Sequence, residues 1–335
     1  MVTDLSVLLQ DLVVSYQNML KIAEEIEKLS KNTKMLSFNS SIEAARAGEA
    51  GKGFAVIAQE IKKFSDKSQE ANQKNIKILE DFHHKIFEVI GVRTADMAYD
   101  LMDKIDRNSM ERNTDVLAWS MMPEILNVLK NPSEANLKDT MALLHNIVDN
   151  KKVYHDIYLV DQNGKIIASG NNAAIVGKDV NSKKWYQHTV QDKTLTVSDM
   201  YYSEEKRETT VTYSCPVFDE QKKLLGVISS RYNWDCIYEI LDQSKVGKDG
   251  RVYVINKDAT VIASLDRSEV LSKSLSDLQP VKLVQSQKEP SGYTIEESFN
   301  KTVISGYARG KGKDDNDTKV WSVIVIEDFQ QHGLS

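Results

Sequence analysis

The sequence predicts an α+β fold, in which an N-terminal antiparallel coiled-coil helical hairpin is followed by a long helix and two tandem α/β modules. Three observations support this fold. Apolar and small residues recur in alternating steps of three and four over roughly the first 85 residues. After about residue 150 the pattern changes to the alternation of strands, and one strand–turn–strand segment occurs twice.

The hairpin is predicted from two heptad seams, over 5–40 and 57–82, that flank a glycine cluster. The cluster consists of Gly48, Gly51 and Gly53. Glycine tolerates the backbone angles of a tight reversal, so we expect a tip near 47–53. We also expect the two arms to bury their seams against each other. The large apolar members of the seams include Ile22, Leu29, Leu36, Ile57, Phe64 and Ile78.

A helical pattern continues from about Phe87 through Trp119, where Pro123 and the sequence 131-NPSE-134 break it before one more helix. The strand region then contains an internal repeat. The segments 158-YLVDQNGKIIAS-169 and 253-YVINKDATVIAS-264 align without gaps, and longer alternating strands follow each. This spacing predicts a duplicated module, although two unrelated hairpins of similar sequence are an alternative.

The predicted domains follow from these patterns. They are a coiled-coil hairpin over 1–86, a long helix with a connecting helix over 87–150, a first module over 151–245, and a second module over 246–335.

Composition excludes several functions. A net charge of −6 argues against nucleic acid as a partner. Cys215 and Cys236 form no CxxC pair, and His83–His84 on one helix point in different directions, so we expect no metal and no cofactor. No nucleophile–base pair or phosphate loop is present, which argues against an enzyme. The chain has neither a signal peptide pattern nor an apolar run of about 18 residues, so we expect no membrane span and a cytoplasmic protein.

The tip carries the most specific motif. Residues 33–68, TKMLSFNSSIEAARAGEAGKGFAVIAQEIKKFSDKS, resemble the cytoplasmic hairpin tip of bacterial chemoreceptors, the methyl-accepting chemotaxis proteins. The resemblance covers roughly 20–85. It implies that hairpins pair into homodimers, that dimers meet as trimers at the tip, and that the tip docks the coupling protein CheW and the histidine kinase CheA.

By position, two groups of tip residues match the family. Those that resemble the trimer contacts are Met35, Phe38, Asn39, Glu43 and Arg46. Those that resemble the surface for the kinase and the coupling protein are Ile42, Glu49 and Val56. A plain coiled-coil dimerisation hairpin is the alternative interpretation of the same segment.

Residues 87–330 resemble a double Cache (dCache) sensor, a long helix followed by two PAS-like α/β modules. In most such receptors the sensor precedes the hairpin, whereas here the hairpin comes first. Because Phe82–Val89 continues the returning arm into the sensor helix, a movement of that helix could reach the tip through one rigid rod.

The resemblance implies a ligand site in the first module, formed by Lys183, Trp185, Tyr186, Tyr201 and Arg231. The amino-acid-binding subgroup has an Arg and an Asp where this chain has Lys183 and Arg231. Two cations without a matched acid favour a small anion such as a carboxylate. Alternatively, Lys183 is solvated, Arg231 pairs with Asp199 or Glu239, and Trp185 and Trp234 belong to the core.

These inferences predict a chemoreceptor-like signal transducer that senses a small, anionic ligand and modulates CheA and CheW through its tip. One alternative is a structural or adaptor protein of receptor arrays that senses no ligand. A second alternative is an enzyme built on the PAS-like modules, but the sequence shows no combination of residues that is typical of a catalytic site.

Overall fold

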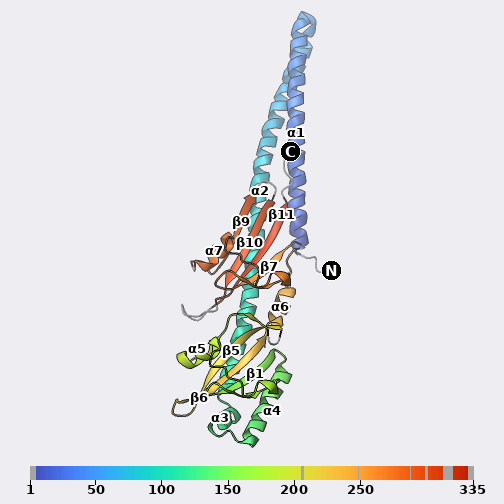
Figure 1. Ribbon diagram of the computed structural model, residues 1–335. Helices are drawn as coiled ribbons and strands as arrows, with labels where there is room; N and C mark the ends of the chain where they lie inside the picture. Colours follow the sequence, from blue (N-terminus) through green and yellow to red (C-terminus); the bar gives the residue numbers. More distant parts are fainter. Residues whose placement is uncertain are drawn as a thin grey trace.

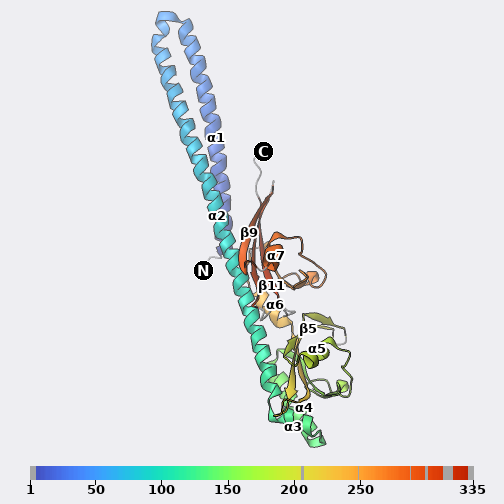
Figure 2. The same cartoon turned by 90° about the vertical axis from the view of Figure 1, so that its left-hand side faces the viewer.

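The computed structural model describes residues 5–204, 207–247, 249–286, 288–298, 301–311 and 320–330. A pair of long helices extends away from two β-sheets, which lie one after the other along the second helix (Figure 1). In the view turned by 90°, this helix runs without a break along one side of both sheets (Figure 2). The mixed α+β class predicted from the sequence is confirmed.

The two long helices are α1, Leu5–Arg46, and α2, Lys52–Ser120, joined by the 3₁₀ turn η1, Gly48–Gly51. The turn depends on two glycines. Gly48 has φ +58°, a value that favours glycine, and a Cβ atom on Gly51 would lie 2.1 Å from the carbonyl oxygen of Ala44. The chain therefore reverses within the interval that the glycine cluster predicts.

The face that packs between α1 and α2 differs from the one expected. Small or moderate side chains are buried at every seventh position, at Ala23, Ser30, Ser37, Ala44, Ala58, Ser65 and Asn72. Hydrogen bonds cross this face from Ser65 Oγ to the Ser30 carbonyl, at 2.7 Å, and from Asn72 Nδ2 to the Ala23 carbonyl, at 2.8 Å. Small residues let two helix backbones approach closely, and they form the contact here.

The expectation that the arms bury their large apolar seams against each other is therefore wrong. Leu29 is 67% exposed and Phe64 is 71% exposed, and Ile22, Leu36, Ile57 and Ile78 are exposed as well. A heptad pattern gives the spacing of residues along one stripe of a helix. Two neighbouring stripes have the same spacing, so the pattern alone does not show which of them is buried. The large stripe faces outward in the single chain except at its end, where Phe82 packs against the apolar cluster at the base of the helix pair.

Helix α2 has 69 residues and passes without a break through the predicted boundary at residues 86 and 87. Beyond it lie α3, Pro123–Lys130, and α4, Glu134–Lys151. Pro123 occupies the first turn of α3, and Ser133 caps α4 by accepting a hydrogen bond from the Asn136 backbone N–H. None of the helices in the described part of the chain combines the length and the apolar character that a membrane crossing requires.

The first sheet has the order β2-β1-β6-β5-β3, with β4 paired to β5. Its strands are β1 Tyr154–Asp161, β2 Ile166–Ser169, β3 Thr196–Val197, β4 Tyr201–Ser203, β5 Glu208–Phe218 and β6 Leu224–Asn233. The helical segments around it are η2 Ala173–Ile175, α5 Lys184–Asp192 and α6 Asp235–Asp242.

The second sheet has the order β8-β7-β11-β10-β9. Its strands are β7 Arg251–Ile255, β8 Val261–Ser264, β9 Ser291–Ser298, β10 Lys301–Arg309 and β11 Ser322–Gln330, and the accompanying segments are η3 Arg267–Glu269 and α7 Gln279–Gln285. Strand β10 lies directly on α2, because a Cβ atom on Gly306 would meet the Thr94 backbone at 2.2 Å.

The two sheets repeat the same register. Tyr158 pairs with Ser169 between β1 and β2, and Tyr253 pairs with Ser264 between β7 and β8. The sequence repeat therefore corresponds to equivalent positions in two similar sheets, and a residue of the first can be compared with its counterpart in the second.

Candidate ligand pocket

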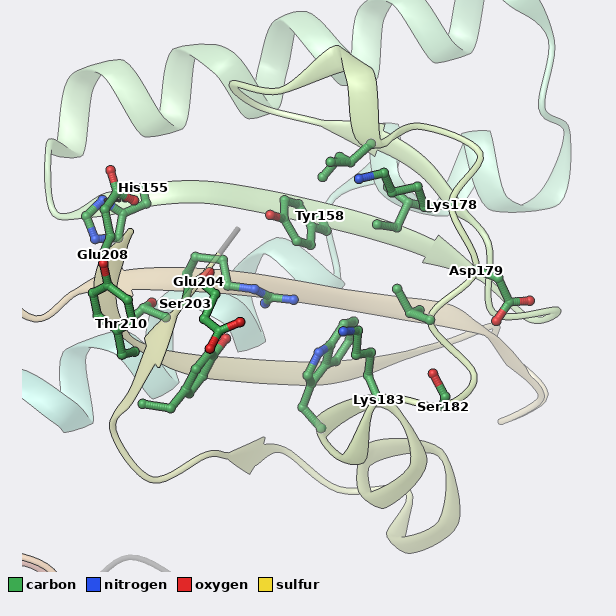
Figure 3. Close-up of a pocket in the computed structure, with 17 residues that line it drawn as sticks. His155, Tyr158, Lys178, Asp179, Ser182, Lys183, Ser203, Glu204, Glu208 and Thr210 are labelled. Atoms are coloured by element: carbon green, nitrogen blue, oxygen red, sulfur yellow. Dashed lines mark ion pairs between the residues drawn. The ribbon is translucent and has the colours of Figure 1, made fainter. Parts of the chain in front are cut away.

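A cavity of about 750 Å³ lies beside the first sheet (Figure 3). Its walls come from β1, β2, β6, the segment between β2 and α5, the start of α5, and residues 201–204 and 208–210, which lie in or next to β4 and β5. The lining residues are His155, Tyr158, Ile166, Ile175, Lys178, Asp179, Val180, Ser182, Lys183, Trp185, Tyr201, Tyr202, Ser203, Glu204, Glu208, Thr210 and Arg231. Its size suits a small molecule.

Arg231 is the most constrained charged group of the pocket. Its guanidinium lies between two aromatic rings, 4.3 Å from the Tyr158 ring centre and 4.6 Å from that of Trp185. Nη1 donates to Ser229 Oγ at 2.8 Å and to the Ser230 carbonyl at 3.1 Å. Only 7% of the residue is exposed, and the groups that hold it by these contacts are neutral. The strand thus presents an immobilised cation to the cavity.

The neighbouring residue on β6 faces the other side of the sheet, as strand alternation requires. Tyr232 is fully buried, and the guanidinium carbon of Arg112 on α2 lies 5.8 Å from its ring centre. One strand therefore contributes Arg231 to the pocket and Tyr232 to the contact with the long helix.

The predicted pocket residues at the start of α5 separate into two groups. Lys183 and Trp185 line the cavity, with Lys183 exposed at the position before the helix. Tyr186 is buried in a small core, where its hydroxyl donates to the Asp161 carbonyl at 3.2 Å. Burial and the nearby carboxylates of Asp161 and Asp179 raise the pKa of Tyr186, so this hydroxyl stays a neutral donor. Consecutive helical residues point about 100° apart, which explains the division.

Tyr201 lines the cavity from β4, with its hydroxyl 3.0 Å from Thr212 Oγ1. The alternative pairing of Arg231 with Asp199 is not seen among the described residues. The Asp199 carboxylate accepts instead from Asn256 Nδ2 at 2.8 Å and from Trp321 Nε1 at 2.9 Å. The structure therefore brings four of the five predicted ligand residues to one cavity.

Trp234 is a core residue, as the alternative interpretation supposed for it. It is fully buried, its Nε1 donates to the Ile262 carbonyl at 2.8 Å, and its ring packs edge-on against Trp321.

Sequence reasoning missed the acidic end of the pocket. Glu204 and Glu208 lie at the end opposite Lys178 and Lys183 (Figure 3). His155 Nδ1 is 3.1 Å from Glu208 Oε2. The cavity therefore contains acids as well as cations: Glu204 and Glu208 lie at one end, and Asp179, whose carboxylate accepts from Asn181, lies near Lys178 at the other. It can receive a ligand that carries a negative and a positive or hydrogen-donating end.

No sequence pattern marks Glu204 and Glu208, although Tyr158, another residue that lines the pocket, opens the internal repeat. Glu208 is the first residue of β5. Neither acid belongs to a periodic pattern, so only the fold brings them opposite the cations. Within the described residues, no group of three or more His, Cys, Asp or Glu side chains is arranged to hold a metal ion.

The predicted tip residues lie at the far end of the helix pair. The large apolar ones, Met35, Phe38, Ile42 and Val56, are exposed, as are Asn39, Glu43, Arg46 and Glu49. Glu43 and Arg46 form an ion pair within the chain at 3.0 Å, and Lys52 pairs with Glu49 at 2.7 Å. The tip thus presents apolar and charged side chains that this single chain does not bury.

Solved structures of sensor domains share the fold. The sensory domain of the Campylobacter jejuni chemoreceptor Tlp3 aligns with a TM-score of 0.56 at 14% identity, over 74% of this chain and 95% of that one. The ligand-binding domain of the Pseudomonas aeruginosa amino acid chemoreceptor PctC, solved with GABA, aligns with a TM-score of 0.53 at 17% identity, over 69% and 97%. At these identities the likeness concerns the fold alone.

Curated relatives match shorter segments. The methyl-accepting chemotaxis protein PctB of Pseudomonas aeruginosa is 39% identical over 84 residues, 25% of this chain and 13% of the relative. The sensory transducer protein YvaQ of Bacillus subtilis is 40% identical over 74 residues, 22% of this chain and 13% of the relative. The matches thus span only a small part of these relatives. A family model covers far more of the chain: the Cache domain model dCache_1 matches residues 21–331, and the chain therefore belongs to the Cache domain family.

Proposed function

We propose that this chain is a signal transducer that binds a small carboxylate-containing ligand in the first-sheet pocket and transmits binding to the tip of its helix pair. The observation that carries the proposal is Arg231, a nearly buried guanidinium that two aromatic rings and two serine oxygens hold at a cavity wall, opposite Asp156 in the strand register. In the described part of the chain both of its hydrogen bonds come from Nη1, which leaves the Nη2 donors for a ligand carboxylate. The proposed domains are those predicted from the sequence, with 151–245 as the ligand-binding module.

The ligand that fits best is a small amino-carboxylate. The expectation of a simple anion rested on two cations without a matched acid, and Glu204 and Glu208 now supply acids at the other end. A carboxylate at Arg231 and an ammonium group toward these acids would satisfy both ends. Two sensor domains of the same fold were solved with GABA and with isoleucine, and both ligands are amino-carboxylates.

Two contacts give the pocket a direct connection to the second sheet. Asp199, two residues before the pocket wall residue Tyr201, binds the indole N–H of Trp321. Trp234, three residues after Arg231, packs against the same indole. The segments that carry Tyr201 and Arg231 therefore both contact Trp321, which immediately precedes β11. A ligand that moves either segment would act on that strand.

Strand β11 ends at the base of the helix pair. Phe329 packs edge-on against Phe87 of α2, with ring centres 5.7 Å apart, in a cluster that also contains Leu9 and Val13 of α1. Arg93 of α2 forms a nearly buried ion pair with Glu327 at 2.8 Å. These contacts support a route in which β11 shifts the base of both helices and the rigid α2 carries the movement to the tip.

At the tip we propose docking of CheA and CheW, with the chain as a homodimer that joins trimers of dimers. The exposed Phe38, Ile42 and Val56 support a protein-binding surface, and the relatives named as methyl-accepting chemotaxis proteins agree with this role. The outward-facing seam of Leu29 and Phe64 supports pairing of two copies. Because these partners act in the cytoplasm, the proposal places the chain there. No catalytic step is assigned to it.

A thermal-shift panel tests ligand binding. The panel compares GABA, isoleucine, acetate and succinate, so that amino-carboxylates are measured beside simple anions. We expect an amino-carboxylate to stabilise the protein by about 2.7 kcal/mol at a hundredfold excess over its dissociation constant. A response to succinate alone would support the simple anion instead, and a panel without any response would count against sensing.

Reconstituted kinase activity tests the output and separates the transducer from the structural adaptor. With CheA and CheW present, we expect the ligand found in the panel to change kinase activity severalfold, and we expect Phe38→Glu to remove the effect without changing ligand affinity. An adaptor would bind CheW equally with and without ligand and leave kinase activity constant. Absence of binding to either protein would contradict the assigned tip.

A further inference from the structure

The second sheet contains a compact polar cluster around Glu269. The Glu269 carboxylate pairs with the Lys273 ammonium and accepts from Ser264 Oγ at 3.1 Å, and the Tyr253 hydroxyl lies 3.5 Å from it. Lys273 also donates to the Tyr253 hydroxyl at 3.0 Å and lies 4.8 Å from the Tyr253 ring centre. One carboxylate thus receives a cation, a serine hydroxyl and a tyrosine hydroxyl from three different segments.

The protonation of the cluster agrees with this arrangement. Partial burial works to lower the pKa of Lys273, but the Glu269 carboxylate and the Tyr253 hydroxyl together raise it above its ordinary value. The ammonium therefore stays charged opposite the carboxylate.

The three donors of this cluster are the repeat counterparts of first-sheet residues. Tyr253, Ser264 and Lys273 correspond to Tyr158, Ser169 and Lys178 at one constant offset. The isolated bridges Lys165↔Asp179 and Thr260↔Ser274 show that the offset holds up to the segment that carries the lysine. Tyr158 and Lys178 line the ligand pocket, so the Glu269 cluster occupies the equivalent place on the second sheet.

The equivalent places differ in their charged side chains. In the strand register, Arg231 lies opposite Asp156 in the first sheet, and Ile326 lies opposite Arg251 in the second. Ile326 is 4% exposed and belongs to an apolar cluster. The counterpart of Glu269 is Ala174, whose methyl group has no charge. The second sheet therefore has an apolar residue at the place of Arg231, has Arg251 at the place of the buried Asp156, and has the Glu269 carboxylate at the place of Ala174.

We infer that the second sheet retains a site for a small carboxylate, formed by Lys273, Ser264 and Tyr253, and that the chain fills it with its own Glu269. The side chain acts as a built-in ligand. It holds η3 against β7 and β8 in the arrangement of an occupied site, so this sheet does not respond to carboxylates in solution.

Chemical rescue tests this inference. Glu269→Ala removes a group nearly equal in size to acetate, and Glu269 is 24% exposed, so acetate can enter from solvent. We expect Glu269→Ala to lower the midpoint of thermal unfolding by roughly 3 to 8 °C. We expect sodium acetate to restore at least half of that loss, relative to sodium chloride at equal ionic strength.

Glu269→Gln is the matched control, because it fills the space and accepts hydrogen bonds without a charge. It should gain no more from acetate than the wild type gains. Adding Lys273→Met to Glu269→Ala should abolish the rescue, since it removes the cation. If Glu269→Ala is unfolded in chloride, a cooperative transition that returns in acetate supports the inference. Equal acetate effects in Glu269→Ala and Glu269→Gln, or a variant that stays unfolded in acetate, would overturn it, and neither outcome bears on the first-sheet pocket.

Discussion

Replacing Arg231 with methionine should lower the affinity of the pocket for its carboxylate ligand about 100-fold, equivalent to about 2.7 kcal/mol. The guanidinium supplies charge-assisted hydrogen bonds that no other buried cation of the pocket wall can replace in the same fixed position. Methionine is similarly long and apolar, so it should still fill the space between Tyr158 and Trp185. Titration calorimetry with the most effective carboxylate of the panel measures the change.

Two further variants make this result specific. Arg231→Lys keeps the charge but loses the planar group that stacks on two rings, so we expect an intermediate loss of about tenfold. Arg251→Met makes the same exchange on the second sheet, where Arg251 pairs with Asp328 at 2.8 Å, and should leave affinity unchanged. An unchanged affinity in Arg231→Met would remove Arg231 from the ligand site and with it the main support for the proposed function.

The sequence predicted which segments form the long helices better than it predicted which face of each helix is buried. The glycine cluster located the reversal, because Gly48 and Gly51 occupy positions where a side chain would be strained or would collide with backbone. The heptad period predicted the arms as well. The choice between the large stripe, with Leu29, and the small stripe, with Ser30, depends on what else packs against the hairpin. The heptad period alone does not determine which of the two stripes is buried.

The pocket was predictable to a similar extent. Lys183, Trp185, Tyr201 and Arg231 were located by resemblance and meet at one cavity. Tyr186 was placed in the pocket by the same resemblance, but it packs in a small core, because adjacent helical positions point in different directions. The acids Glu204 and Glu208 could not be assigned, because the pairing of β4 with β5 brings them to the cavity. Such contacts are set by strand register rather than by any local pattern.

A substitution in the outward-facing seam is expected to have a large effect on dimerisation. Changing Phe64 to glutamate should raise the dissociation constant of the homodimer at least 100-fold. In a symmetric dimer two phenylalanine side chains would leave an apolar interface, at a cost of about 1.5 to 3 kcal/mol each. Sedimentation equilibrium over a series of protein concentrations measures the constant. A wild-type protein that remains monomeric throughout would contradict the proposed dimer.

The neighbouring residue supplies the control that separates association from folding. Phe64 is 71% exposed in the single chain, so Phe64→Glu should keep the helix content and change the unfolding free energy of the monomer by no more than about 0.5 kcal/mol. Ser65 is buried against α1 and donates to the Ser30 carbonyl, so Ser65→Leu should force the two helices apart and destabilise the helix pair by about 1 to 3 kcal/mol. Circular dichroism during thermal unfolding distinguishes the two. If Phe64→Glu unfolded the helix pair while Ser65→Leu left it intact, the large stripe would be the inner face, and the assignment of the two faces would have to be reversed.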